Sequence, residues 1–155
     1  ADTTLIQLKS GKLILVDYAH CKQGEEDCEA VIDLKATLTE TLKSLGRSEI
    51  DTVLFTHADK DHIRNASEFF WFDHASKYQS KDRIKIKELW VPAGLVLEEG
   101  PTDEARIIRQ EARHRLKEGK GVRVFSWPEA FHTWMDENDL SFESLKHLIS
   151  DAGTV

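Results

Sequence analysis

The spacing of apolar and polar positions predicts that the first third of the chain is a β-hairpin followed by a helix and a strand. Residues 3–9 alternate and residues 13–18 are mostly apolar, with a Ser-Gly-Lys turn between them, which is typical of a hairpin. Between residues 31 and 45 apolar side chains recur every three or four positions, which predicts an amphipathic helix ending near Gly46. Residues 51–56 predict a short buried strand.

The remainder of the chain continues the alternation of helices and strands. We expect helices over 63–74 and 101–117, strands over 84–91 and 122–125, and helical segments within 128–149; Pro92 should end the second of the central strands. Such alternation indicates helices packed on a sheet, and therefore an α/β fold. A length of 155 residues fits one domain over 1–155.

Composition restricts the classes of protein that the chain can represent. Hydrophobic residues make up 40% and charged residues 32%, no apolar run reaches the roughly 18 residues of a membrane span, and no signal peptide is visible. The chain also lacks an initiator Met, so we expect it to begin inside a longer protein. The net charge of -7 argues against attraction of nucleic acid by the whole surface. Two cysteines, Cys21 and Cys28, predict no disulfide framework and a reducing, cytoplasmic location.

Four potential metal ligands lie within six residues, directly after the predicted strand 51–56. They are His57, Asp59, Asp61 and His62. Neutral imidazoles and carboxylates are common ligands of divalent cations, and a loop at the carboxyl end of a buried strand can aim several of them at one point. Cations would also relieve the repulsion between neighbouring carboxylates. In the simpler alternative, Asp61 caps a helix beginning at Ile63 and the other three side chains are solvated.

The segment Thr56-His57-Ala58-Asp59-Lys60-Asp61-His62 resembles the metal loop of the metallo-β-lactamase superfamily, His-x-His-x-Asp-His, with Asp59 in place of the second His. This variant is similar to the branch containing the hydrolase domain of the DNA-uptake competence channel protein. Residues 1–6 resemble the end of the Gly-Asp segment that opens that domain, and residues 11–17 resemble its hairpin and Leu-Ile-Asp strand. The resemblance covers about the first 95 residues.

The resemblance implies the N-terminal half of an αββα sandwich with a dinuclear site for two Zn ions, Mn being the alternative. His57 and Asp59 would contribute to the first metal, Asp61 and His62 to the second. Asp61 would also orient the water that attacks the substrate, and Asp17 would steady the loop from behind the ligands. From the residues alone, Asp17 is equally well a turn residue at a strand end. The implied reaction is metal-assisted hydrolysis of a phosphoester or phosphodiester, and thus of a nucleic-acid-like substrate.

Two departures from the family pattern favour a second interpretation. Arg64-Asn65 stands where the family has Gly-Gly, and the acidic and His-His-Gly ligands of the second half are absent after Pro92. We therefore expect either a missing C-terminal half or a partner chain to complete the site. The alternative function is a degenerate, non-catalytic domain that acts as an interaction or assembly module.

Other features of the sequence suggest structural roles. We expect His20 to be an ordinary loop residue, and its combination with Cys21 and Cys28 is a weak zinc motif. Phe69–Phe72 is typical of a core. Two basic runs are most simply solvated faces, although a basic patch beside the metal loop would favour a phosphate-bearing substrate. They comprise Lys77, Lys81, Arg83, Lys85 and Lys87, and Arg106, Arg109, Arg113, Arg115 and Lys117.

Overall fold

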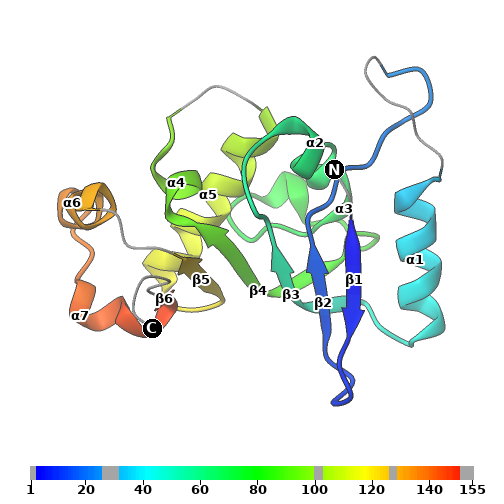
Figure 1. Cartoon of the computed structure of the whole chain (residues 1–155), viewed down its shortest axis with the longest axis horizontal. Coiled ribbons are helices and arrows are strands. Elements are labelled where there is room, and N and C mark those ends of the chain that lie inside the picture. The colour runs from blue at the N-terminus through cyan, green and yellow to red at the C-terminus, as the bar shows by residue number, and fades with distance from the viewer. Residues whose placement is uncertain (1–2, 26–31, 100–102, 126–128, 151–155) are drawn as a thin grey trace.

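A computed structural model describes residues 3–25, 32–99, 103–125 and 129–150, and it shows a mixed α/β architecture (Figure 1). All six strands belong to one sheet in the order β1-β2-β3-β4-β5-β6. The strands are β1 (Thr4–Gln7), β2 (Leu13–Val16), β3 (Glu49–Leu54), β4 (Lys85–Pro92), β5 (Val122–Phe125) and β6 (Ile149–Ser150). The longer helices are α1 (Leu34–Ser44), α5 (Asp103–Glu118) and α6 (Glu129–Glu137). Short helices are α2 (Lys60–Ile63), α3 (Ala66–Phe69), α4 (Ala93–Leu97), α7 (Phe142–Leu145), η1 (Ser76–Tyr78) and η2 (Lys146–Leu148).

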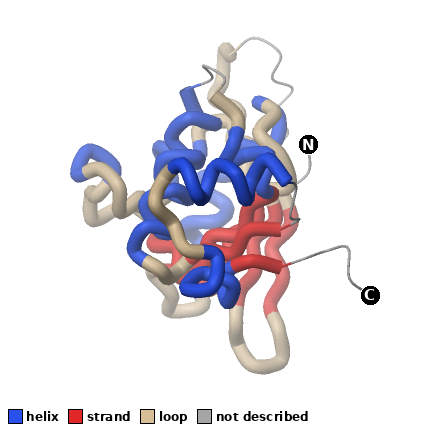
Figure 2. The backbone as a smooth tube through the Cα atoms, turned by 90° about the vertical axis from the view of Figure 1, so that its left-hand side faces the viewer, coloured by secondary structure: helices blue, strands red, loops and turns tan. Residues whose placement is uncertain are grey.

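The sheet is parallel except at its first strand. β1 pairs antiparallel with β2, which confirms the predicted hairpin, and β2 to β6 pair in parallel. Each parallel strand lies next to the one before it in the sequence. Because crossovers between parallel strands are right-handed, this order directs the connecting helices to the same face of the sheet. Figure 2 accordingly shows most of the helices gathered on one side of the strands.

The two faces of the sheet differ in burial. Leu15, Val53, Leu89 and Val124 point toward the helices and have no exposed surface. The opposite face carries a half-buried apolar stripe that crosses β2 to β5, and Ile6 of β1, next to Ile14, is 41% exposed. Parallel sheets are usually covered on both faces. The stripe consists of Ile14, Val16, Leu54, Trp90 and Phe125, and we call it the open face.

The prediction of one continuous helix over 63–74 is wrong. Two single-turn helices, α2 and α3, stand there instead, separated by Asn65 in the left-handed conformation (φ 58°). The chain then extends, and Phe70 bridges to Ile84. The aromatic residues of this segment are buried as expected, because Phe69, Phe70 and Phe72 are at most 2% exposed.

Smaller differences concern the bounds and two unforeseen elements. Pro92 ends β4 as expected but also directly precedes α4, a helix that the sequence did not predict. β6 was not expected either. In the described part of the chain, no helix has both the length and the apolar character needed to cross a bilayer.

Candidate functional site

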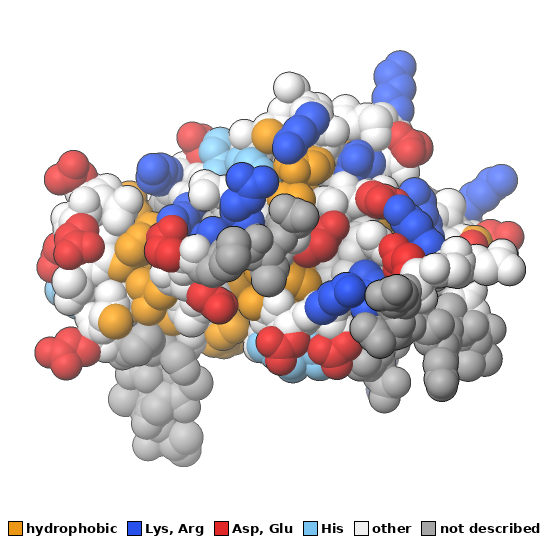
Figure 3. Space-filling view, turned by 90° about the horizontal axis from the view of Figure 1, so that it is seen from above, with side chains coloured by type: hydrophobic (Ala, Val, Ile, Leu, Met, Phe, Trp, Pro, Cys, Tyr) orange, Lys and Arg blue, Asp and Glu red, His pale blue; other side chains and the backbone are white. Residues whose placement is uncertain are grey.

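The predicted metal loop lies at the carboxyl end of β3, beside the segment that follows β2. The two strands run in parallel, so both segments emerge at the same edge of the sheet (Figure 1). Backbone hydrogen bonds join them, from the Tyr18 amide to the His62 carbonyl (2.9 Å) and from the His20 amide to the Arg64 carbonyl (3.0 Å). At this end of the molecule, histidine and carboxylate side chains adjoin each other on the surface (Figure 3).

Asp17 is the buried anchor of the loop. Its side chain is 6% exposed, and its carboxylate accepts hydrogen bonds from the Thr56 amide (2.8 Å), the Thr56 hydroxyl (2.7 Å) and His62 Nδ1 (2.7 Å). Asp17 has a φ of 54°, a conformation that Asp adopts more readily than most residues. Asp17 therefore connects the segment after β2 to the loop after β3, and its role as the outer partner of a metal ligand stays a prediction.

The four expected ligands are arranged as two pairs. His57 Nε2 lies 3.5 Å from Asp59 Oδ2, and His62 Nε2 lies 3.5 Å from Asp61 Oδ2. The two imidazole rings are packed together, with 3.5 Å between their centroids. Two donors at about 2.1 Å from one tetrahedral ion are roughly 3.4 Å apart, so the spacing within each pair suits a shared cation.

The pairs do not merge into a larger cluster. Within the described ranges, no group of three or more His, Cys, Asp and Glu side chains is arranged to hold an ion. The side chains of Asp59 and Asp61 are 76% and 64% exposed, whereas that of His62 is only 19% exposed. Desolvation raises the pKa of Asp61, but a hydrogen bond with its own backbone and the charge of His62 outweigh it and lower that pKa below its ordinary value. The imidazoles are therefore held in place, and the carboxylates face solvent.

The simpler interpretation of Asp61 as a helix cap is wrong. Helix α2 begins at Lys60, so Asp61 lies within its first turn and Asp59 occupies the cap position. The Asp59 side chain makes no capping hydrogen bond. Neither carboxylate is therefore explained by helix capping.

Asn65 has a left-handed backbone conformation, with a φ of 58°. Its amide nitrogen Nδ2 donates to the His20 carbonyl (2.8 Å) and to the Glu25 carboxylate (3.1 Å). Asn tolerates this conformation better than other non-glycine residues because its short side chain hydrogen-bonds locally. The side chain of Asn65 thus stabilises the turn that separates α2 from α3.

We expect Asn65→Ala to lower the free energy of unfolding by about 2–3 kcal/mol. The left-handed conformation destabilises the folded state by ~1–2 kcal/mol when the residue is alanine, and loss of the hydrogen bonds lowers the stability by about 1 kcal/mol more. Urea denaturation measures the change. Asn138→Ala is the control, since Asn138 Nδ2 also donates to a backbone carbonyl, that of Trp134 (2.8 Å), but its φ is not positive. Equal losses in the two variants would show that the backbone of Asn65 carries no special cost.

His20 does not join the metal loop. It is only 8% exposed, and its Nδ1 lies 3.9 Å from Asp33 Oδ1 and has no hydrogen-bond partner among the described residues. A cavity of about 390 Å³ between His20 and the first turns of α1 adjoins it. The expectation of a loop residue is therefore correct, but His20 is buried.

The expectation of reduced cysteines is wrong at Cys21, which is disulfide-bonded. The other cysteine, Cys28, lies outside the described residues. A disulfide at Cys21 removes the thiolate that the weak His20-Cys21-Cys28 zinc motif requires. It also withdraws the support that reduced cysteines gave to a cytoplasmic location, which stays a prediction.

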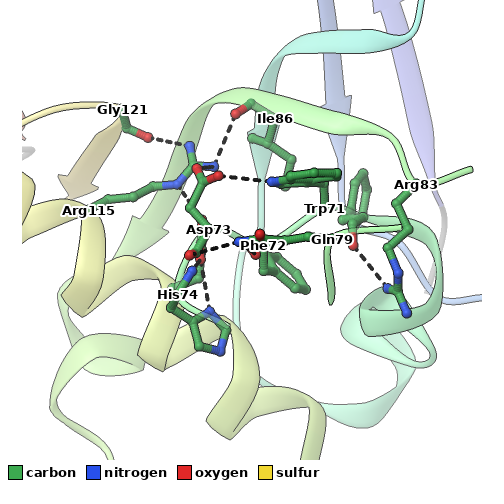
Figure 4. A network of polar contacts seen from close by, with 11 residues as sticks. Trp71, Phe72, Asp73, His74, Gln79, Arg83, Ile86, Arg115 and Gly121 are labelled. Carbon is green, nitrogen blue, oxygen red and sulfur yellow. Dashed lines mark hydrogen bonds and ion pairs between the residues drawn. The ribbon is translucent and has the colours of Figure 1, made fainter. Parts of the chain in front are cut away.

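A second polar network is buried near the amino ends of β4 and β5 (Figure 4). Glu111 has no exposed surface, and it accepts hydrogen bonds from His74 and Arg115. Burial raises the pKa of Glu111, but the hydrogen bond from His74 and the positive charge of Arg115 outweigh it and hold that pKa at about 2. The network connects α5 to the sheet and to residues 73–74.

The second basic run is a solvated face only in part, because Arg106 and Lys117 are exposed but the arginines between them are not. Arg109 and Arg115 are 4% and 5% exposed, and Arg113 donates to the Val96 carbonyl (2.7 Å). In the first run, Arg83 donates to the carbonyls of Ser67 and Phe70. These guanidinium groups hold the fold together, so they give no evidence for a phosphate-bearing substrate.

No family model, curated protein or solved structure matches this chain. The resemblance to the metallo-β-lactamase superfamily therefore stays a prediction from the motif. The sequence did not reveal two features that shape the loop. They are the hydrogen bond of the Thr56 hydroxyl and the left-handed turn at Asn65. The position of Thr56, directly before the candidate ligand His57, was a visible signal for the role of its hydroxyl.

Proposed function

We propose that residues 57–62 are the metal-binding part of a metal-dependent hydrolase site of the metallo-β-lactamase type, acting on a phosphoester or phosphodiester. The main support is the pair of Nε2–carboxylate distances of 3.5 Å, in which each imidazole presents Nε2 to a neighbouring carboxylate. A buried carboxylate on the far side of a ligating His is a common feature of metal sites, and Asp17 has that position relative to His62.

In this proposal His57 and Asp59 hold one ion, and Asp61 and His62 hold the other. Zinc fits the imidazole ligands, and the carboxylates also accept manganese. Divalent ions there would lower the pKa of water toward neutrality and polarise the scissile bond. The chain's own contribution is to fix the imidazoles through Asp17 and to place the exposed Asp61 carboxylate where it can orient a water molecule.

Each pair supplies only two donors, so we propose that further ligands come from another part of the protein or from a partner chain. The open face supports this idea. Its half-buried Leu54, Trp90 and Phe125 form an apolar surface that a second layer can cover, and Trp90 and Phe125 pack edge to face at 5.3 Å. A second layer on this face would also lie beside the loop that leaves β3.

Calorimetric titration of the whole metal-free protein with Zn²⁺ or Mn²⁺, together with any partner chain that completes the site, tests the proposal. We expect two ions per chain for the wild type and the loss of one site in His57→Ala, because this change removes one imidazole donor. The matched control is His132→Ala on α6, where His132 Nδ1 lies 3.3 Å from Asp136 Oδ2 at an exposed position. Equal binding by the wild type and His57→Ala would exclude the loop as a metal site.

The open face also favours the second candidate function, a non-catalytic interaction module. On that proposal the apolar stripe binds another protein and residues 57–62 bind no metal. Trp90→Glu would then weaken association with the partner, and the double change at Asp61 and His62 would have no effect on it. Metal binding by the wild type would favour the hydrolase over the module.

A further inference from the structure

Thr56 lies at the centre of the hydrogen bonds that hold the two imidazoles. Its hydroxyl oxygen is 2.7 Å from Asp17 Oδ2, 2.9 Å from His57 Nδ1 and 3.4 Å from His62 Nδ1. Asp17 Oδ2 is itself 2.7 Å from His62 Nδ1. One carboxylate therefore reaches both imidazoles, His62 directly and His57 through the hydroxyl of Thr56.

The positions of the protons follow from what each group can donate. An ionised carboxylate only accepts hydrogen bonds, so the single hydroxyl proton of Thr56 points to Asp17. The hydroxyl oxygen can then only accept from His57, which requires a proton on His57 Nδ1. In the same way, His62 must carry its proton on Nδ1 in order to donate to Asp17.

We propose that Thr56 is a positioning residue that relays the charge of Asp17 to His57 and thereby fixes the tautomer of that imidazole. Both neutral rings then carry the proton on Nδ1 and present the lone pair of Nε2 toward Asp59 and Asp61. The functional role of this relay, but not the tautomers, rests on the proposed metal site. The tautomers themselves do not require a metal.

Without the hydrogen bond to Thr56, no described contact would favour the tautomer of His57 in which Nε2 is unprotonated. Asp59 Oδ2, at 3.5 Å, would attract a proton on Nε2 and so stabilise the other tautomer, which cannot bind a metal through that atom. The hydroxyl of Thr56 therefore opposes the effect of Asp59 in the metal-free protein. His62 has a direct partner in Asp17 and does not depend on Thr56.

The test is ¹⁵N NMR of the imidazoles in the metal-free protein, at a pH well above the ordinary imidazole pKa of about 6.5. In the wild type, His57 and His62 should both show a protonated Nδ1 and an unprotonated Nε2. In Thr56→Val, His57 should shift toward the Nε2-protonated form while His62 stays unchanged. Thr56→Ser, which keeps the hydroxyl, should restore the wild-type spectrum of His57. Thr39→Val on α1 controls for the loss of a hydroxyl elsewhere.

Metal titration of the same variants provides a second readout. Loss of an outer partner of a ligating His typically weakens metal binding 10–100-fold, and we expect about that for Thr56→Val but not for Thr56→Ser. A His57 that is protonated on Nε2 in the wild type, or that keeps its tautomer in Thr56→Val, would overturn the relay. If the tautomers respond as expected but no metal binds, the relay stands and the proposed hydrolase site fails.

Discussion

Arg115→Ala is expected to lower the free energy of unfolding by about 3–5 kcal/mol, the range found when one partner of a buried ion pair is removed. The guanidinium uses all five of its N–H donors. Without it, His74 is the one cationic side chain among the described residues that still pairs with the buried Glu111 carboxylate. Three backbone carbonyls at the start of β4 and β5 lose a donor as well. The acceptors of Arg115 are Glu111 (2.6 Å), Gly121 (2.8 Å), Ile86 (3.1 Å), Lys87 (3.3 Å) and Asp73 (3.3 Å).

Urea denaturation followed by circular dichroism measures this loss, and Arg106→Ala is the matched control. Arg106 lies on the same helix but is exposed, so its replacement should change stability by less than about 0.5 kcal/mol. A loss below about 1 kcal/mol in Arg115→Ala would mean that water replaces the guanidinium and that the network is not buried in solution.

The pH dependence of stability provides an independent check on the same network. The pKa of Glu111 is lowered from 4.5 to about 2 in the folded protein, so the ionised carboxylate stabilises the fold above pH 4.5. This stabilisation, on the order of 3 kcal/mol, is lost as the pH falls from about 5 to 2. Glu111→Gln should be less stable at neutral pH and should show a weaker acid dependence than the wild type.

The sequence predicted the parts of the fold that depend on local spacing. The hairpin, helix α1 and the parallel strands follow from period-two and period-3.6 patterns, and helix α5 was expected within two residues of its observed bounds. The helix over 63–74 failed because the apolar residues of Phe69–Phe72 match either period. Its interruption depends on Asn65, whose left-handed backbone is stabilised by hydrogen bonds to a distant segment.

In the candidate site too, features that are contiguous in the sequence were predictable, and contacts between distant residues were not. The candidate ligands of residues 57–62 and their place after β3 were visible in the sequence because these residues are contiguous. The family resemblance implied that Asp17 steadies the loop, but not its contact with His62, which lies 45 positions further along the chain. The roles of Arg109, Arg113 and Arg115 were missed because a run of basic residues on a helix gives no sign of which carbonyls lie within reach.

Replacing Asp61 and His62 together by alanine is expected to reduce hydrolysis of a generic phosphodiester, such as bis-p-nitrophenyl phosphate, to the rate without enzyme. The double change removes one of the two Nε2–carboxylate pairs and with it the carboxylate that we assign to orienting water. Because the reaction in this proposal needs both pairs, the remaining His57 and Asp59 should not sustain it.

The assay uses the whole protein with Zn²⁺ or Mn²⁺ supplied in excess, and Lys60→Ala is the control within the same loop. Lys60 is exposed and supplies no ligand, so its replacement should leave both the rate and the metal content close to those of the wild type. Unfolding of the double variant is checked by urea denaturation, because Asp17 loses the hydrogen bond from His62. Hydrolysis that survives in a folded double variant would place the catalytic centre elsewhere, and the proposed role of residues 57–62 would be wrong.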